Sequence, residues 1–225
     1  MNIRWFGHSC FMLTAENGTR ILTDPYDETV GYPMHKLEAE ILTISHDHFD
    51  HNYLGMLKNE PRVIKGVGEW ELNGLRIVGI DSPHDDVDGQ KRGRNTIFVF
   101  EMDGLRIAHL GDLGCIPSDD VIDALGNLDV LFAPIGGTFT IEPAAAREIA
   151  NRTNANVLIP MHYQTPVLKF KDELIGVAAL ISTATGCRIH RLNQSECTIT
   201  PKSLGEDRLL VFDYVREYEC ETEEE

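Results

Sequence analysis

The chain has 225 residues, 42% of them hydrophobic and 25% charged, which suits a globular protein with a sizeable core in one large domain or two small ones. Its 36 acidic and 20 basic residues give a formal net charge of -16, and no basic stripe is present, so we expect no nucleic-acid partner. No apolar run approaches the length of a membrane span, and we expect no membrane partner either.

The first half of the chain predicts short strands joined by tight turns. Asn17-Gly18 and Met102-Asp103-Gly104 are typical of hairpin turns. A short helix is expected over residues 51–58, packed through Leu54 and Leu57. The expected strands cover residues 3–6, 10–14, 20–23, 41–45, 62–65, 75–80, 95–101 and 105–110.

The second half alternates strands with helices. One helix is expected to begin after Ser118, whose hydroxyl can cap it, and another covers residues 142–153 with Pro143 in its first turn. This order predicts the α/β class, with two sheets and helices outside them, in one domain over residues 1–215 followed by an acidic tail over 216–225. The remaining expected elements are strands over 129–133, 156–160, 187–192 and 209–214 and a helix over 171–184.

The richest chemical feature of the chain is the run from Ser45 to His51, Ser-His-Asp-His-Phe-Asp-His, which directly follows an apolar, strand-like stretch. Imidazole nitrogens and carboxylate oxygens are ligands that zinc prefers. Alternate side chains of an extended segment share a face, so His46 and His48 are expected to converge on one ion. Where the chain turns, Asp50 and His51 can reach a second ion. The alternative is a polar loop that is rich in histidine by chance.

Three more candidate ligands follow expected strands: His84, Asp112 and His162. Each alone is weak, because a single histidine beside a turn is more often a surface residue or a satisfied core residue. With the first cluster they complete two sets of ligands. The expected sets are His46, His48 and His84 for one ion and Asp50, His51 and His162 for the other, with Asp112 bridging the two through its two oxygens.

These motifs resemble the metallo-beta-lactamase superfamily. Within it, the chain is similar to zinc-dependent hydrolases that include the ascorbate-6-phosphate lactonases, and more distantly to the N-acyl-phosphatidylethanolamine phospholipase D group. The resemblance implies a four-layer αββα sandwich of two mixed sheets flanked by helices, with the site at one edge between the sheets. The segments that carry it are 6–9 (Phe-Gly-His-Ser), 22–25 (Leu-Thr-Asp-Pro), 44–51, 92–96, 109–112, 133–140 and 159–163.

The resemblance also implies a role for Asp24, as the acid that holds a ligand histidine through its other ring nitrogen. The alternative is an aspartate that starts a turn before Pro25. His8 lies between two expected strands, where it can either reach the site or serve as a turn residue. His109 is separated from Asp112 by an odd number of residues, so it should point to the other face and be structural, as we also expect for His35 and His190.

Five residues are candidates for binding substrate: His8, Arg92, Arg94, Gly136 and Gly137. The backbone N–H groups of Gly136 and Gly137 can face an anion or a polarised carbonyl, although such glycines more often serve only to let two backbone segments pass closely. Arg92 and Arg94 are the only concentrated positive charge near a ligand loop and are candidates for binding a phosphate or carboxylate. Such charges are more often simply solvated.

The expected activity is that of a dinuclear metal-dependent hydrolase acting on a small molecule. Two divalent ions about 3.5–4 Å apart can share a water and lower its pKa from 15.7 to near 7, which gives a hydroxide that attacks an ester, lactone or phosphodiester. Asp112 would bridge the ions and Asp50 would orient the hydroxide as well as bind metal. Zinc is expected, and Mn or Fe suits the same ligands.

Two alternatives remain open at this point. A di-iron oxidoreductase on the same fold usually has Glu at the position of His48 and a fused flavin domain, which we do not expect here. A non-catalytic metal-binding module is disfavoured by the complete ligand set. Five scattered cysteines and a start without the shape of a signal peptide predict a reducing cytoplasmic location, and the sequence leaves a homo-oligomer open.

Overall fold

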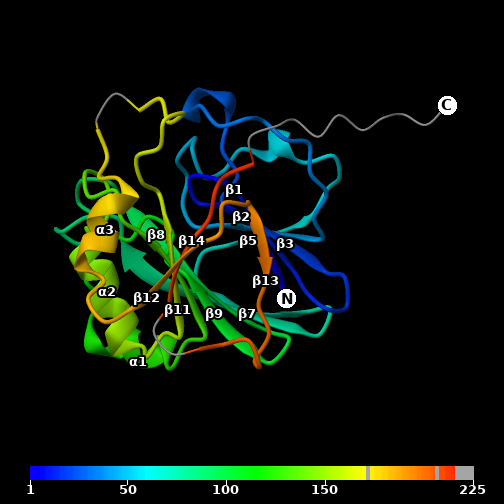
Figure 1. Ribbon diagram of the computed structural model, residues 1–225. Helices are drawn as coiled ribbons and strands as arrows, with labels where there is room; N and C mark the ends of the chain where they lie inside the picture. Colours follow the sequence, from blue (N-terminus) through cyan, green and yellow to red (C-terminus); the bar gives the residue numbers. More distant parts are fainter. Residues whose placement is uncertain (171–172, 206–207, 216–225) are drawn as a thin grey trace.

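Two mixed β-sheets face each other and enclose the main hydrophobic core (Figure 1). The computed structural model describes residues 1–170, 173–205 and 208–215, so the expected acidic tail over 216–225 lies outside the described residues. The first sheet has six strands in the order β13-β1-β2-β3-β4-β5. Its strands are β1 (Asn2–Gly7), β2 (Cys10–Thr14), β3 (Arg20–Thr23), β4 (Ile41–Ile44), β5 (Arg62–Lys65) and β13 (Glu196–Thr198).

The second sheet has eight strands in the order β12-β14-β11-β10-β9-β8-β7-β6. Neighbours from β12 to β9 run parallel, whereas β9, β8, β7 and β6 pair in antiparallel fashion. The strands are β6 (Gly68–Leu72), β7 (Leu75–Pro83), β8 (Arg94–Met102), β9 (Leu105–His109), β10 (Val130–Pro134), β11 (Val157–Met161), β12 (Arg188–Arg191) and β14 (Arg208–Val211). The expected α/β architecture of two mixed sheets is confirmed.

Strand periodicity explains why both faces of the six-stranded sheet are buried. In β2, Phe11 and Leu13 belong to the core between the sheets, whereas Cys10 and Met12 belong to a second apolar cluster on the outer face. Alternate residues of a strand point to opposite faces, so an apolar run such as 10–13 serves both clusters.

The outer layers of the two sheets differ. The helices α1 (Asp119–Leu125), α2 (Pro143–Arg152) and α3 (Val177–Thr183) lie beside the eight-stranded sheet, where α2 contacts β10 (Figure 1). Over the six-stranded sheet, the second apolar cluster is closed by Tyr26, Val30 and Met56. In the described part of the chain this layer contains the 3-10 turns η1 (Glu28–Val30) and η2 (Leu54–Met56) rather than the α-helices that were expected. None of the described helices is both long and apolar enough to cross a bilayer.

Two helix predictions were wrong in extent. Residues 51–58 form only the short turn η2, because Leu37 pairs with Leu57 and the N–H of Lys58 donates to the Leu37 carbonyl, which holds this segment extended. The helix expected over 171–184 begins only at Val177, since Gln164 bridges to Gly176 immediately before it, and residues 171–172 lie outside the described chain. Tertiary pairing overrides local helix propensity at both places.

Two strands, β6 and β13, were not predicted. β6 pairs with β7 through a tight turn at Asn73 and Gly74, both with positive φ. It is an edge strand whose Glu69 and Glu71 are exposed, so its sequence lacks the apolar run of a buried strand. β13 has only three residues and pairs with β1.

Candidate metal centre

The expected ligands all lie at the ends of strands, and the two sheets bring these ends to one edge of the sandwich. The carboxyl ends of neighbouring parallel strands meet at one edge of a sheet, and such edges commonly hold ligand sites. His8 follows β1, Asp24 follows β3, residues 46–51 follow β4, His84 follows β7, Asp112 lies three residues after β9 and His162 follows β11.

One oxygen of Asp112 is the centre of this cluster. Its Oδ2 lies 3.1 Å from Nε2 of His162, 3.2 Å from Nε2 of His51, 3.5 Å from Nε2 of His84 and 3.8 Å from Nε2 of His46. Asp112 is only 2% exposed. A single carboxylate oxygen therefore faces imidazoles from both of the expected ligand sets.

The two remaining expected ligands complete the cluster. Nδ1 of His48 lies 2.9 Å from Nε2 of His46 and 3.3 Å from Nε2 of His84. Oδ2 of Asp50 lies 3.5 Å from Nε2 of His51. The structure thus brings all seven expected ligands together, in overlapping groups whose atoms lie within 4.8 Å of one another: His46, His48 and His84; His46, His51 and Asp112; and Asp50, His51 and His162 with His8.

The donor set fits divalent cations. Nε2 of His51 and Oδ1 of Asp112 are buried atoms that have no hydrogen-bond partner in the described chain. Proteins rarely leave buried polar atoms unpartnered, and a bound ion commonly satisfies those that remain. Imidazole nitrogens that face one another at 2.9 Å, as in His46 and His48, need a proton or a cation between them. Asp50 and Asp112 would supply the negative charge that offsets the ions.

Asp24 fixes which nitrogen two of the histidines turn toward the site. Its Oδ2 accepts from Nδ1 of His51 at 2.9 Å and from the hydroxyl of Ser45 at 2.6 Å. Because the Ser45 proton goes to Asp24, the Ser45 oxygen accepts from Nδ1 of His46 at 2.9 Å. Both rings are therefore protonated on Nδ1 and direct the lone pair of Nε2 into the cluster, the state a metal ligand needs.

Burial and neighbouring charges set the protonation of the cluster. Burial, with His51 nearby, lowers the pKa of His46 to about 3. Burial and the adjacent His162 lower the pKa of His8 to about 4. Burial alone would raise the pKa of Asp112, but His162 and His51 hold it well below its usual value. Burial alone would lower the pKa of His51 as well, but the Asp112 and Asp50 carboxylates raise it well above its usual value. A cation bound at Nε2 of His51 would displace that proton, because metal ligands bind as neutral imidazoles and ionised carboxylates.

Three residues at the site have a backbone conformation that side chains other than glycine rarely adopt. His8 has φ of 51°, Asp24 of 38° and His162 of 48°. The other non-glycine residues with positive φ in the described chain are all Asn or Asp, which tolerate it best. Such strain costs on the order of 1–3 kcal/mol for each residue and is concentrated at functional sites.

Two residues that sequence reasoning did not single out hold the ligands in place, Ser45 and Asn95. Oδ1 of Asn95 accepts from the backbone N–H of Asp112 at 2.9 Å, while its amide donates to the hydroxyl of Ser82 at 2.8 Å and the carbonyl of Leu110 at 2.9 Å. Gly111 packs against both, because a Cβ there would lie 2.3 Å from the Asn95 oxygen and 2.6 Å from the Ser45 Cβ. The only signal in the sequence was their position inside segments 44–51 and 92–96.

The candidate substrate residues fall in different places. His8 is fully buried in the cluster, with Nε2 3.1 Å from Oδ2 of Asp50. Arg92 lines the cavity over the cluster, whereas Arg94 lines a different depression and pairs with Asp81 and Asp88.

The contacts of Gly136 and Gly137 suit glycines that let two backbone segments pass closely better than they suit an anion-binding site. The N–H of Gly137 donates to the Ile141 carbonyl at 3.3 Å, so it is not directed at the cluster. A Cβ at Gly136 would lie 2.5 Å from the His162 carbonyl, so this glycine lets two segments pass closely.

The three histidines expected to be structural lie outside the metal-binding groups found in the described chain. Nδ1 of His109 accepts from the N–H of Gly111 at 3.2 Å, so its Nε2 carries the proton and donates to the Ser9 carbonyl at 3.0 Å. His35 packs against Phe6 with ring centroids 5.3 Å apart, and His190 is exposed on β12.

A family model described as a beta-lactamase superfamily domain matches residues 2–162. The chain therefore belongs to the beta-lactamase superfamily, and its architecture is the metallo-beta-lactamase fold. Two curated relatives carry the name metal-dependent hydrolase. The protein of Korarchaeum cryptofilum is 31% identical over 201 residues, covering 77% of this chain and 88% of the relative. That of Thermococcus onnurineus is 28% identical over 195 residues, covering 73% and 85%.

Solved structures agree with this assignment. A proposed zinc-dependent hydrolase of the metallo-beta-lactamase superfamily from Thermotoga maritima superposes with a TM-score of 0.78 at 36% identity, covering 95% of this chain and 99% of that one. An isothiocyanate hydrolase from Delia radicum gut bacteria superposes with a TM-score of 0.67 at 14% identity, covering 94% of this chain and 96% of that one, which is a likeness of fold alone.

Proposed function

We propose that this protein is a metal-dependent hydrolase with two divalent cations. The observation that carries the proposal is Oδ2 of Asp112, which lies within 3.8 Å of imidazole nitrogens from both ligand sets. The residues that would hold one cation are His46, His48 and His84, those for the other are Asp50, His51 and His162, and Asp112 would be shared. The names of the relatives support the same class of activity.

Cations held there would supply Lewis acidity, which makes water a nucleophile at neutral pH and polarises the oxygen of the bond under attack. The chain's own residues supply position and charge. Asp50 lines the cavity, and its Oδ2 is held 3.1 Å from His8. We propose that this carboxylate orients the attacking water and takes up its proton, while His8 keeps the carboxylate in place.

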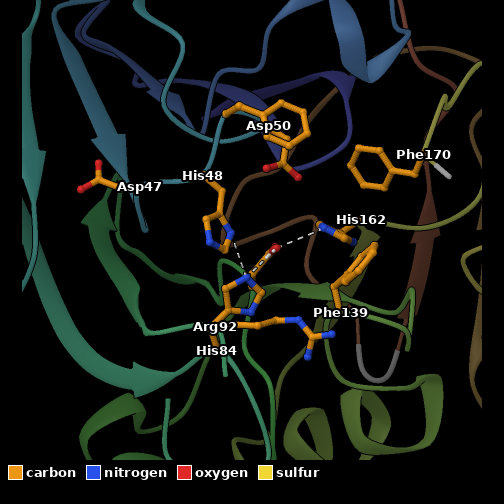
Figure 2. Close-up of a pocket in the computed structure, with 10 residues that line it drawn as sticks. Asp47, His48, Asp50, His84, Arg92, Phe139, His162 and Phe170 are labelled. Atoms are coloured by element: carbon orange, nitrogen blue, oxygen red, sulfur yellow. Dashed lines mark hydrogen bonds and ion pairs between the residues drawn. The ribbon is translucent and has the colours of Figure 1, made fainter. Parts of the chain in front are cut away.

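A small molecule is the substrate that suits the cavity. The cavity has a volume of about 540 Å³ and opens over His48, Asp50, His84, Asp112 and His162. Figure 2 shows His48, Asp50, His84 and His162 around it. This volume is in the range of small-ligand sites. The reaction would be hydrolysis of an ester, lactone or phosphodiester. Zinc suits the imidazole-rich donor set best, with Mn and Fe as alternatives for elemental analysis to distinguish.

A cytoplasmic location belongs to the same proposal. It rests on the cysteines, because the four within the described residues form no disulfide bond. The oxidoreductase alternative has less support, since position 48 is histidine, and the structure gives no observation that favours it over hydrolysis.

Elemental analysis and a hydrolysis screen test the proposal together. Purified protein should contain two equivalents of a divalent metal, and it should hydrolyse at least one member of a panel of esters, lactones and phosphodiesters in a chelator-sensitive manner. Asp112→Ala should lose both metal equivalents and activity together, because it removes the shared oxygen. Two retained metals with normal turnover in this variant would contradict the role of Asp112. Full metal loading with no turnover on any panel member would favour a non-catalytic module.

A further inference from the structure

Three phenylalanines form one wall of the cavity that opens over the metal ligands. Phe49, Phe139 and Phe170 all line it. Figure 2 shows Phe139 and Phe170 on the same side of the cavity. Phe170 lies between the other two, with ring centroids 6.4 Å from Phe49 and 6.1 Å from Phe139. Phe49 is 54% exposed although it stands between two expected ligands in the sequence. Exposed apolar side chains gathered at a polar site commonly mark a surface that binds a ligand.

The aromatic wall continues to the reacting centre. The Phe170 ring lies 6.1 Å from the His162 ring and 5.3 Å from the His8 ring. An apolar group placed against Phe170 would therefore have its attached polar bond beside the ligands of the second ion. This placement favours a substrate whose apolar group is bonded directly to the group that is hydrolysed.

Arg92 supplies a positive charge on the same cavity. Its guanidinium carbon lies 5.3 Å from the centre of the Phe139 ring, and Nη2 donates to the Thr138 carbonyl at 3.3 Å. Within the described residues no carboxylate pairs with this side chain. The nearby cations are all paired: Lys65 with Asp47, Lys91 with Asp86, and Arg94 with Asp81 and Asp88. Arginine in this state can form a bidentate pair with an anion.

Asp85 fixes the backbone of the loop that carries Arg92. The Asp85 carboxylate is buried and accepts the backbone N–H groups of Val87, Gly89, Lys91 and Arg92, each within 2.9 Å. The loop that carries Arg92 is therefore tied to the residue that directly follows His84. Figure 2 shows Arg92 beside His84, on the side of the cavity opposite Asp50.

We propose, resting on the proposed hydrolase function, that the substrate is an amphiphilic anion: a carboxylic ester or lactone with an apolar acyl or aryl group for the phenylalanine wall and a separate anionic group for Arg92. In the reaction, water adds to the acyl carbon, the bond between that carbon and the leaving oxygen breaks, and the leaving oxygen takes a proton. No oxidant or further reactant is needed.

Binding of product-like probes tests the proposal without relying on turnover. Isothermal titration calorimetry on the purified full chain would compare 4-phenylbutyrate with butyrate, which lacks the ring, and with 4-phenylbutyramide, which lacks the charge. We expect both comparisons to show at least about tenfold weaker binding of the simpler probe. A fourth probe, 4-phenylbutyl phosphate, distinguishes a phosphate from a carboxylate as the preferred anion.

Variants separate the contribution of Arg92 from direct binding of the carboxylate by a metal. Arg92→Gln should weaken the binding of 4-phenylbutyrate by about tenfold and leave the affinity for 4-phenylbutyramide unchanged. Arg92→Lys should restore part of the lost affinity. Arg94→Gln makes the same charge change two residues away on a side chain that is already paired, so it is the matched control and should have no effect. Phe170→Ala should weaken 4-phenylbutyrate but not butyrate.

The outcomes distinguish this proposal from the proposed function. Equal effects of Arg92→Gln and Arg94→Gln, or equal affinity for the acid and the amide in the native protein, would overturn the anionic subsite. Equal affinity for 4-phenylbutyrate and butyrate would overturn the apolar subsite. Hydrolysis is measured separately, with mono-4-nitrophenyl glutarate, an ester that also carries a free carboxylate, and with the ester panel. If the probes bind as expected but no ester is hydrolysed, the result would count against the hydrolase function and still support the two subsites.

Discussion

The hydroxyl of Ser45 donates to Oδ2 of Asp24 at 2.6 Å, and this one hydrogen bond determines which ring nitrogen of His46 carries the proton. It turns the Ser45 oxygen into the acceptor for Nδ1 of His46. The same Asp24 oxygen also accepts from His51, so one buried carboxylate orients a ligand in each of two metal-binding groups. Burial alone would raise the pKa of Asp24, but the hydrogen bond from His51 lowers it, which keeps the acceptor ionised.

Replacing Ser45 by Ala should weaken one metal site and spare the other. Without the hydroxyl, Nδ1 of His46 loses its acceptor while the bond between His51 and Asp24 remains. Loss of such an orienting partner typically costs about 10–100-fold in metal affinity. Elemental analysis after dialysis against graded chelator should show one equivalent lost early.

Thr43→Val is the matched control for this change. Thr43 lies on β4, the strand that ends directly before Ser45, and its buried hydroxyl has no hydrogen-bond partner in the described chain. The valine variant should keep both metals. Asp24→Asn, in contrast, should weaken both sites, and a Ser45→Ala protein that loses both equivalents together would contradict separate orientation of His46.

His109→Ala should lower stability without changing metal content. The His109 ring bridges the Ser9 carbonyl and the Gly111 N–H, both buried, and lies outside the metal-binding groups of the described residues. Each of these two buried groups costs about 1–3 kcal/mol when left unpaired, so the free energy of unfolding should fall by roughly 2–6 kcal/mol. Urea unfolding measures the loss, and elemental analysis should still find the native stoichiometry. A missing metal equivalent would show that His109 acts on the site.

The ligand residues could be predicted from sequence because their chemistry is local. The run from His46 to His51 follows an apolar strand, and each later ligand follows a strand as well, so strand ends alone indicate that they meet. The residues that orient them could not be found in this way. Ser45 and Asn95 are common polar residues whose roles arise only when β4, β8 and β9 pack together.

The same limit explains the errors in the fold. The helix expected over 51–58 is replaced by chain that pairs with Leu37, a contact across twenty residues that no local pattern reveals. Arg92 and Arg94 look equivalent in sequence, two residues apart. Only the fold shows that Asp81 and Asp88 engage Arg94 while Arg92 faces the cavity.

Asp85→Asn should disturb the loop that carries Arg92. The carboxylate accepts four backbone N–H groups, two on each oxygen, and an asparagine amide has only one oxygen to offer. We expect a lower melting temperature and a severalfold loss of affinity for 4-phenylbutyrate, with 4-phenylbutyramide binding unchanged. Asp86→Asn, which removes only an exposed pair with Lys91, is the control. Native affinity in Asp85→Asn would mean that the loop keeps its shape without these bonds.

Metal removal should destabilise the protein through the shared carboxylate. A ligand present at 100 times its dissociation constant stabilises the folded state by about 2.7 kcal/mol, and each kcal/mol changes the melting temperature by roughly 2–4 °C at this chain length. Removal of each cation by a chelator should therefore lower the melting temperature by roughly 5–11 °C. Added zinc should restore it. His109→Ala should show the same shift from a lower starting point, because its metal ligands are intact. Asp112→Ala should show almost none, since both ions depend on the oxygen it lacks. Equal melting temperatures for chelated and zinc-loaded native protein would mean that these imidazoles and carboxylates are held together without a bound cation.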